Sequence, residues 1–483
     1  MRSEETPLDA AIRGLARGAR RLDRVIEAWR PAAWLELDRR IRSAIGQGEI
    51  ERPAHPWTST NRLPGALRAA LRAPAPTEAG LALALCDPSG LIRQAALPHA
   101  ARRPAVLPLV AVRTTDWVPA VRDRAREILT AALPGADGRT LGVTVPVLLQ
   151  LRRRTRGDAA GTLLDETLRA APDESLTALL RNRDRATRRL AVGIALERGL
   201  LTPAELAKTA TYDNDIAVQD MAATAALAAG VPDETLPLLL AARPSRVRAA
   251  GITALHGAGR TDEAEPFLYD RSGLVRACAR WVLRQAGRDP LALYRAACAD
   301  PSTVPGWAPY GLAECGDRDD ADIPVLRALT AHPVARVRAS AVAGLRILEP
   351  QEWRGVLPLL DDPSAAVARE VENTLVDHAY RIPEEDMLTR AAPDRPYRQR
   401  AAALRVLSAR YGTARLRCAL RMLDDPDPRL RARAVTVICR DWWSVRHFDP
   451  AEAEEILLVL ERNHDAVPRL AASRIREALR PRG

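Results

Sequence analysis

Apolar residues recur at intervals of four along many short stretches of the chain. One such stretch carries Val337, Ala341 and Leu345, a spacing that places the three side chains on one face of an α-helix. Another short apolar run lies upstream of each stretch, as at residues 322–331 and 352–360. The pattern therefore predicts pairs of short helices, each helix with one buried face.

The predicted helix pairs repeat with a period near 30 residues. An alignment on the apolar residue before a recurrent arginine gives the register Ile92, Val121, Thr187, Val218, Val247, Val275, Trp307, Val337, Val367, Tyr397, Leu430 and Leu470. The one long gap, between Val121 and Thr187, spans two periods and indicates a degenerate repeat near residues 150–165. Self-similarity at a fixed period of this length is typical of a solenoid.

A short turn separates the two helices of each repeat. Asp87, Asp362 and Asp425 stand in this turn, and a proline follows each of them. We expect the aspartates to accept hydrogen bonds from free N–H groups of the second helix, and the prolines to occupy its first position. Each repeat is therefore predicted to be a helix, a tight turn and a second helix.

An arginine follows the turn aspartate by six residues in several repeats. The pairs are Asp87 and Arg93, Asp116 and Arg122, Asp270 and Arg276, and Asp425 and Arg431. Other repeats keep one member of the pair, because Arg338 follows His332, Gln219 follows Asp213 and Ala368 follows Asp362.

The Asp–Arg pattern resembles that of HEAT repeats, in the short bacterial form also found in phycobilisome-lyase-type proteins. The resemblance covers roughly residues 80–480. It implies an all-α, armadillo-like solenoid of about 12–13 repeats, in which the aspartates and arginines form a ladder of charge-assisted bonds between neighbouring repeats. Such a repeat cannot bury its apolar face alone, so each repeat needs a neighbour.

The two ends of the chain depart from the period. Residues 1–80 contain longer amphipathic stretches and a loop rich in proline at 51–65. Terminal repeats of solenoids are atypical because they cover the last apolar face. We therefore predict an N-terminal helical cap with a proline-rich loop at 1–80, the solenoid at 81–440, and a C-terminal repeat and cap at 441–483.

Composition narrows the class of protein. The chain of 483 residues is 47% hydrophobic but only 4% aromatic, so its core must consist mainly of Ala, Leu and Val. No run of about 18 apolar residues and no signal-peptide core is present, so no membrane attachment is expected. The six cysteines lack paired spacing, which favours a reducing, cytoplasmic compartment. They are Cys86, Cys278, Cys298, Cys315, Cys418 and Cys439.

A search for catalytic motifs finds none. Lys208, the single lysine, is not preceded by the glycines of a phosphate-binding loop, and no Gly-x-Ser-x-Gly or His-Glu-x-x-His sequence occurs. His332 occupies a turn where other repeats carry Asp, so we interpret it as a turn residue. The acidic stretch 316–324 lacks the spacing of a calcium loop and is interpreted as a solvated loop. The sequence thus predicts no catalytic residue, cofactor or metal site.

Positive charge is concentrated near the C-terminus. The formal net charge is +11, and residues 395–440 alone contain twelve arginines against three aspartates. Tyr397, Ala401 and Leu404 are predicted to face inward on one helix, and Leu416, Ala419, Leu420 and Leu423 on the next. By helical spacing, Arg398, Arg405, Arg417 and Arg421 should then project outward as a basic patch. Arg431 is the one ladder residue expected in this segment.

These observations favour a non-catalytic scaffold or adaptor that binds an unidentified protein through its concave, second-helix surface. A solenoid that binds nucleic acid through the basic patch is the first alternative, because a basic surface supplies most non-specific affinity for phosphate. A HEAT-like DNA-repair glycosylase or a lyase-type enzyme subunit is the second. A solvated basic face produced by coding bias is also compatible with the patch, and the oligomeric state is left open.

Overall fold

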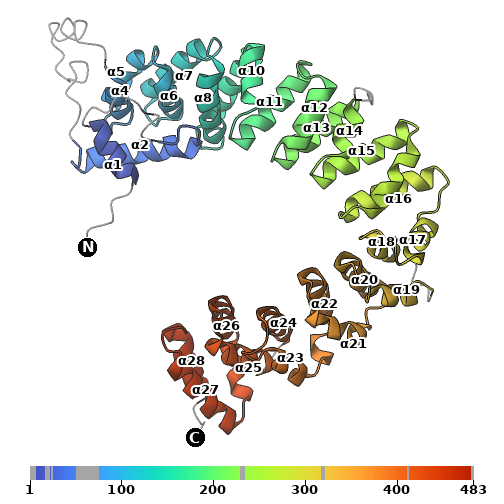
Figure 1. Ribbon diagram of the computed structural model, residues 1–483. Coiled ribbons are helices and arrows are strands. Elements are labelled where there is room, and N and C mark those ends of the chain that lie inside the picture. Colours follow the sequence, from blue (N-terminus) through green and yellow to red (C-terminus); the bar gives the residue numbers. More distant parts are fainter. Residues whose placement is uncertain are drawn as a thin grey trace, which may run out of the picture. The chain divides into compact units, whose positions relative to one another are not determined.

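The computed structural model describes residues 7–16, 22, 26–50, 76–228, 234–316, 321–410 and 413–479. All regular secondary structure in these ranges is helical, which confirms the all-α class (Figure 1). The chain divides into two compact units, Met1–Gly251 (unit 1) and Ile252–Gly483 (unit 2). The boundary lies inside one helix, so the division does not interrupt the helix order.

Unit 1 begins with two helices that precede the repeats, α1 (Pro7–Ala16) and α2 (Pro31–Gly46). Pairs of short antiparallel helices follow. They are α4 (Glu78–Leu85) with α5 (Gly90–Ala100), α6 (Leu107–Arg113) with α7 (Pro119–Ala132), α8 (Gly138–Leu151) with α9 (Asp158–Ala170), α10 (Asp173–Leu179) with α11 (Arg185–Glu197), α12 (Pro203–Tyr212) with α13 (Ile216–Ala228), and α14 (Thr235–Leu240) with the start of α15 (Ser245–Gly257). The α8–α9 pair is the degenerate repeat indicated by the long gap in the register.

Unit 2 continues the same plan, with several first helices built partly or wholly from 3-10 turns. Its pairs are η3 (Thr261–Tyr269) with α16 (Gly273–Gln285), α17 (Pro290–Ala299) with α18 (Ala308–Cys315), α19 (Asp322–Leu329) with α20 (Ala335–Leu348), α21 (Trp353–Val356) and η4 (Leu357–Asp361) with α22 (Ala365–Asp377), α23 (Glu384–Arg390) with α24 (Tyr397–Ser408), α25 (Thr413–Arg421) and η6 (Met422–Asp424) with α26 (Pro428–Asp441), and α27 (Pro450–Arg462) with α28 (Arg469–Leu479). The described ranges thus contain thirteen helix pairs, in agreement with the predicted solenoid of about 12–13 repeats.

The helices of unit 2 form two layers. The second helices α20, α22, α24 and α26 follow one another along one side of the unit, and the first helices α19, α21, α23 and α25 along the other (Figure 1). Consecutive second helices pack against each other, as α20 does with α22 and α22 with α24. Side chains that project away from the first helices therefore line a shared surface of several repeats.

The aligned residues that precede the recurrent arginine are buried in most repeats. Ile92, Val121, Thr187, Val218, Val247, Val275, Val337, Val367 and Leu430 are all less than 9% exposed. Three positions differ from the prediction. Trp307 and Tyr397 are partly exposed, and Leu470 is 65% exposed, because α28 buries Ala471, Ala472 and Ile475 instead. Trp307 covers a ladder arginine, since the guanidinium of Arg276 lies 5.7 Å from its ring.

The N-terminal helix α2 is joined to the repeats by buried charge. It packs against α6 and α8. Its Asp38 forms an ion pair with the buried Arg113 on α6, with 2.5 Å between Asp38 Oδ1 and Arg113 Nη2. Arg113 also contacts Asp116 at 3.1 Å, so the helix is connected directly to the ladder. The proline-rich loop at 51–65 lies outside the described residues, and the domain boundaries at 80 and 440 remain predictions.

In several repeats, the recurrent arginine links its own repeat to the next one along the chain. Arg93 forms a two-pronged pair with Asp116 through Nε and Nη2, at 2.9 and 2.8 Å, and both side chains are almost fully buried. The same link joins Arg188 to Asp213, Arg338 to Asp362 and Arg400 to Asp425, while Arg276 uses Glu314 of α18 as its partner. The paired residues are 23–25 positions apart in the aspartate links and 38 in the glutamate link.

The six-residue spacing within a repeat has a different origin. Nη1 of Arg93 donates to the backbone carbonyl of Asp87, not to its carboxylate, at 2.8 Å. Arg122, Arg276 and Arg431 bind the carbonyls of Asp116, Asp270 and Asp425 in the same way. Among the described residues, Arg122 and Arg431 form no two-pronged link to a following repeat.

The turn aspartates lie two residues before the helix N-cap, whereas the sequence had predicted that they occupy it. Asp87 accepts the N–H of Ser89, and Asp270, Asp362 and Asp425 likewise accept the N–H two positions on. Helix α5 begins at Gly90, after Ser89 as its N-cap, so Asp87 stabilises the turn and not the first helical N–H groups. The proline after the aspartate therefore precedes the helix. The N-cap therefore lies two residues later than predicted, and the helix–turn–helix order is unchanged.

Repeats that keep one member of the Asp–Arg pair form complete links with their neighbours. Arg338, whose own turn carries His332, pairs with Asp362 of the next repeat at 2.8 Å, and Ala368 replaces the arginine that would follow Asp362. Where Ala308 stands in place of a ladder arginine, the next turn carries His332 instead of an aspartate. His332 Nε2 lies 2.7 Å from the Pro301 carbonyl, and Nδ1 accepts the N–H of Val334. The exchange avoids a buried carboxylate without a cation.

We expect Arg276→Ala to lower the free energy of unfolding by about 1.5–3 kcal/mol, because Glu314 loses its two-pronged partner and keeps only the single contact with Arg280. Arg271, in the same turn, is exposed and forms no ion pair with a described residue, so Arg271→Ala should stay within about 0.5 kcal/mol. Urea unfolding of the two variants measures the difference. Equal shifts would contradict a structural role for the ladder.

We expect Gly311→Ala to destabilise unit 2 by about 1–3 kcal/mol, because an added Cβ would lie 2.2 Å from the ring of the buried Tyr294. That ring is fixed, since its hydroxyl donates to the Leu268 carbonyl at 2.8 Å. Gly193 of α11 is a matched control, with its nearest atom at 3.7 Å, and Gly193→Ala should stabilise by about 0.5–1 kcal/mol. Thermal melts that shift in the same direction would contradict this packing.

Stability should fall in acid. Burial raises the pKa of Asp116 and Asp362, but hydrogen bonds from Arg93 and Arg338 outweigh it, so both pKa values lie below the ordinary range. The hydrogen bond from Arg189 lowers the pKa of Asp215 to about 2. Because the folded state binds fewer protons, this stability is complete above about pH 4 and is lost as pH falls toward 2. Urea midpoints between pH 6 and 2.5 test it, and Asp215→Asn should flatten the low-pH part of the curve.

Candidate partner-binding groove

Many arginines of the basic segment 395–440 are used inside the fold. Arg400 forms the buried ladder link to Asp425, and Arg415 pairs with Asp441 at 2.6 Å, with both side chains about 6% exposed. Arg410 donates to the carbonyls of Ala379 and Ile382. The expectation that Arg431 is the one ladder residue in this segment was wrong, because Arg400 is a full link. Much of the local positive charge is therefore structural.

The four arginines of the predicted patch lie on two different layers. Arg398 and Arg405 belong to the second helix α24, whereas Arg417 and Arg421 belong to the first helix α25. Arg417 pairs with Glu384 and Glu452 at 2.5 Å each and lies 5.4 Å from the ring of Phe448. It therefore connects α23, α25 and α27 and does not project freely, as the sequence interpretation had it. Arg421 is exposed beside Phe448 and Glu455.

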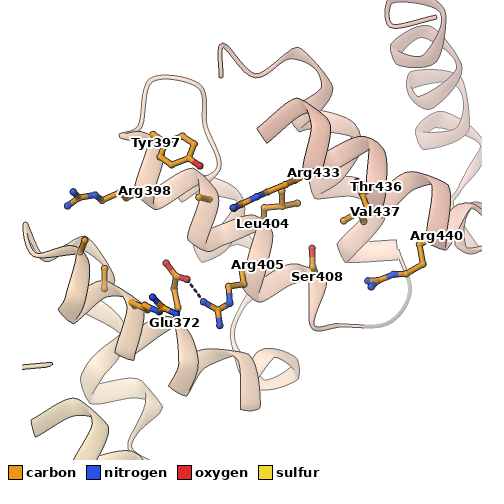
Figure 2. Close-up of a pocket in the computed structure, with 14 residues that line it drawn as sticks. Glu372, Tyr397, Arg398, Leu404, Arg405, Ser408, Arg433, Thr436, Val437 and Arg440 are labelled. Carbon is orange, nitrogen blue, oxygen red and sulfur yellow. Dashed lines mark hydrogen bonds and ion pairs between the residues drawn. The ribbon is translucent and has the colours of Figure 1, made fainter. Parts of the chain in front are cut away.

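Arg398 and Arg405 face a groove on the second-helix layer (Figure 2). The groove has a volume of about 670 Å³ and is built by α22, α24 and α26. Its lining residues are Ala365, Ala368, Arg369, Glu372, Tyr397, Arg398, Ala401, Leu404, Arg405, Ser408, Arg433, Thr436, Val437 and Arg440. Five arginines and one glutamate give this lining a formal charge of +4. We call this site the α22–α26 groove.

The arginines of the α22–α26 groove follow a simple spacing on two helices. Arg398 and Arg405 are seven residues apart on α24, and Arg433 and Arg440 are seven apart on α26. Seven residues are close to two helical turns, so each pair projects from one side of its helix, with about 10 Å between the two Cα positions. The basic patch predicted from the sequence did not include Arg369, Arg433 and Arg440. The seven-residue spacing of Arg433 and Arg440 equals that of Arg398 and Arg405, and this match could have identified them.

Three of these arginines have no ion pair with a described residue. Arg369 and Arg433 are exposed and form no ion pair with any residue in the described ranges. Arg398 donates to the Pro363 carbonyl at 3.1 Å, which leaves its charge without an anion there. Arg405 pairs with Glu372, and Arg440 with Asp441 beside it. The site therefore presents several guanidinium groups to solvent at short range.

The floor of the groove is apolar. Leu404 and Val437 contribute buried surface, and Ala401 contributes a partly buried methyl group. Tyr397 and Ala401 were predicted to face inward and are only partly buried, because the ladder arginine of α24 is Arg400 and the register shifts by two residues. The guanidinium of Arg429 lies 4.7 Å from the Tyr397 ring and covers it.

The described residues contain no group of three or more His, Cys, Asp or Glu side chains arranged to hold a metal ion. Burial raises the pKa of the Cys298 and Cys418 thiols to about 12, so neither is a ready nucleophile. Part of the acidic stretch 316–324 is outside the described residues, but its Asp322 pairs with Arg295 at 2.8 Å. No described helix is both long enough and apolar enough to span a bilayer.

The helix pairs and their ladder define the protein as an α-solenoid of HEAT-like repeats. No protein-family model and no curated protein sequence matches the chain. Solved structures with similar folds include a C-terminal fragment of the Chaetomium thermophilum cohesin loader SCC2, at 13% identity and a TM-score of 0.38, over 88% of this chain and 43% of that one. Kap121p bound to RanGTP matches at 14% identity and a TM-score of 0.36, over 86% and 53%. This chain spans about half the length of these proteins.

Proposed function

We propose that the protein is a non-catalytic scaffold or adaptor, and that the α22–α26 groove binds an acidic segment of a partner protein. The observation that carries the proposal is the groove lining, in which five arginines face one glutamate and three of the arginines, Arg369, Arg398 and Arg433, have no ion pair among the described residues. The six free cysteines fit a reducing, cytoplasmic site of action.

Arg369 and Arg433 form no ion pair with a described residue, so they contribute little to the stability of the unbound chain. Like charges that share one surface repel by a few tenths of a kcal/mol. A carboxylate can accept two parallel hydrogen bonds from a guanidinium, so an acidic segment would relieve the repulsion at several positions. The apolar floor at Leu404 and Val437 would cover aliphatic side chains of such a segment.

Two features favour a protein partner over the alternatives. Single-stranded nucleic acid binds through aromatic rings on which its bases stack, but Arg429 covers the ring of Tyr397, the one aromatic residue in the groove lining. An enzyme would need a free acid or base, but Glu372, the one carboxylate in the lining, is paired with Arg405.

The proposal predicts that Arg369→Glu with Arg433→Glu weakens binding of a fluorescein-labelled ten-residue glutamate peptide by at least about tenfold. Each lost charge-assisted hydrogen bond is worth about 1.5–3 kcal/mol, and about 1.4 kcal/mol corresponds to a factor of ten. Fluorescence anisotropy in 150 mM salt measures the affinity. The melting temperature should change little, because both side chains are exposed.

Arg271→Glu with Arg476→Glu is the matched control. Both arginines are exposed in unit 2, outside the groove lining, and the double variant has the same net charge as the test variant. An equal loss of binding in the control would show that net charge alone attracts the peptide. Tighter binding of a single-stranded DNA oligonucleotide, lost in the groove variant, would instead favour a nucleic-acid partner.

A further inference from the structure

The ion pair between Glu372 and Arg405 stands inside the α22–α26 groove. Glu372 Oε2 on α22 accepts a hydrogen bond of 2.9 Å from Arg405 Nη1 on α24, and Figure 2 shows the two side chains facing each other across the groove. Arg405 Nη2 also donates to Asn373 Oδ1 at 2.8 Å. Two consecutive residues of α22 therefore hold the guanidinium of Arg405.

This pair differs from the ladder links in its burial and its geometry. The side chain of Arg405 is 48% exposed and that of Glu372 is 18% exposed, whereas both members of the Arg93–Asp116 link are at most 1% exposed. Glu372 accepts from one guanidinium nitrogen, and not from two as the ladder carboxylates do. An exposed pair of this kind contributes little to folding, because water screens its charges.

The residues around Glu372 indicate a role in binding for the Glu372–Arg405 pair. It is the one carboxylate among the lining residues, and the lining also contains five arginines. A guanidinium has five N–H donors, and Arg405 uses two of them here. An acidic ligand can reach the three remaining donors of Arg405 or replace Glu372, and in either case it meets the negative charge of the Glu372 carboxylate at this guanidinium.

We propose that Glu372 is an internal competitor for the acidic segment, occupying Arg405 in the free protein and leaving it when the segment binds. This inference rests on the proposed function of the groove. A ligand with one carboxylate gains little, because it replaces an equivalent group at Arg405. A segment with several carboxylates also reaches Arg369 and Arg433, which have no internal anion within the described residues, so the competition selects for partners with clustered acidic residues.

The test variant is Glu372→Gln, which removes the charge and keeps the shape of the side chain. Binding of the labelled ten-residue glutamate peptide should become about threefold to fivefold tighter in 150 mM salt, the range expected from the loss of one exposed ion pair. The same substitution in an Arg405→Gln background should give no gain. Competition experiments with free acetate should show no difference between wild type and Glu372→Gln above the effect of ionic strength.

Glu385→Gln is the charge-matched control, since Glu385 is exposed on the first helix α23 and is not part of the groove lining. Its effect should stay below about 1.5-fold, because charges beyond roughly 8 Å are screened at this salt concentration. Equal gains in both variants, or a gain that persists without Arg405, would overturn the inference. An unchanged affinity in Glu372→Gln would overturn it too, while the loss of binding in Arg369→Glu with Arg433→Glu would leave the proposed function standing. Absence of peptide binding to both wild type and Glu372→Gln would overturn both.

Discussion

The buried link between an arginine of one repeat and a carboxylate of the next is the interaction on which this structure depends. Two short helices cannot enclose a core, so each repeat is stable only against a neighbour. Apolar contact alone would let neighbouring repeats slide or rotate, because Ala, Leu and Val surfaces are not directional. The two-pronged pair fixes direction and distance together, and the third guanidinium nitrogen binds the backbone of its own turn. One side chain thus orients both the turn within a repeat and the junction between repeats.

The ladder also explains why the arginine of one repeat and the turn residue of the next repeat are replaced together. A buried carboxylate without a cation is costly, which explains why one repeat without the arginine is followed by a turn without the carboxylate. Ala308 and His332 illustrate this exchange, since the imidazole binds the Pro301 carbonyl where a ladder arginine would otherwise donate. Arg276 illustrates a different solution, in which a glutamate from the helix α18 supplies the carboxylate. The repeats therefore tolerate sequence change as long as each junction stays electrically balanced.

Ion pairs within the fold neutralise some arginines of the C-terminal region and leave others free to bind a partner. Arg400, Arg415 and Arg417 are each matched to carboxylates, and their contribution to the net charge of the segment has no bearing on binding. Arg369 and Arg433 face a groove whose single carboxylate already has a partner. The unpaired positive charge of the C-terminal region is thus concentrated at the α22–α26 groove. The positions of the arginines there can favour one anionic partner over another.

The sequence by itself determined the helix pairs, their period, the turn aspartates and the region where arginines accumulate. These follow from local spacing, because a period of four marks a helical face and an Asp-Pro turn ends a short helix. Only the tertiary structure decided which carboxylate each arginine meets and which layer it faces. Arg398 and Arg400 are two residues apart, yet one is exposed at the groove and the other is buried in a ladder link. Arg405 and Arg417 belong to adjacent helices that face opposite layers. The rotation of a short helix about its axis is set by packing against its neighbours, and a shift of two residues turns a side chain by about 200°, from core to solvent.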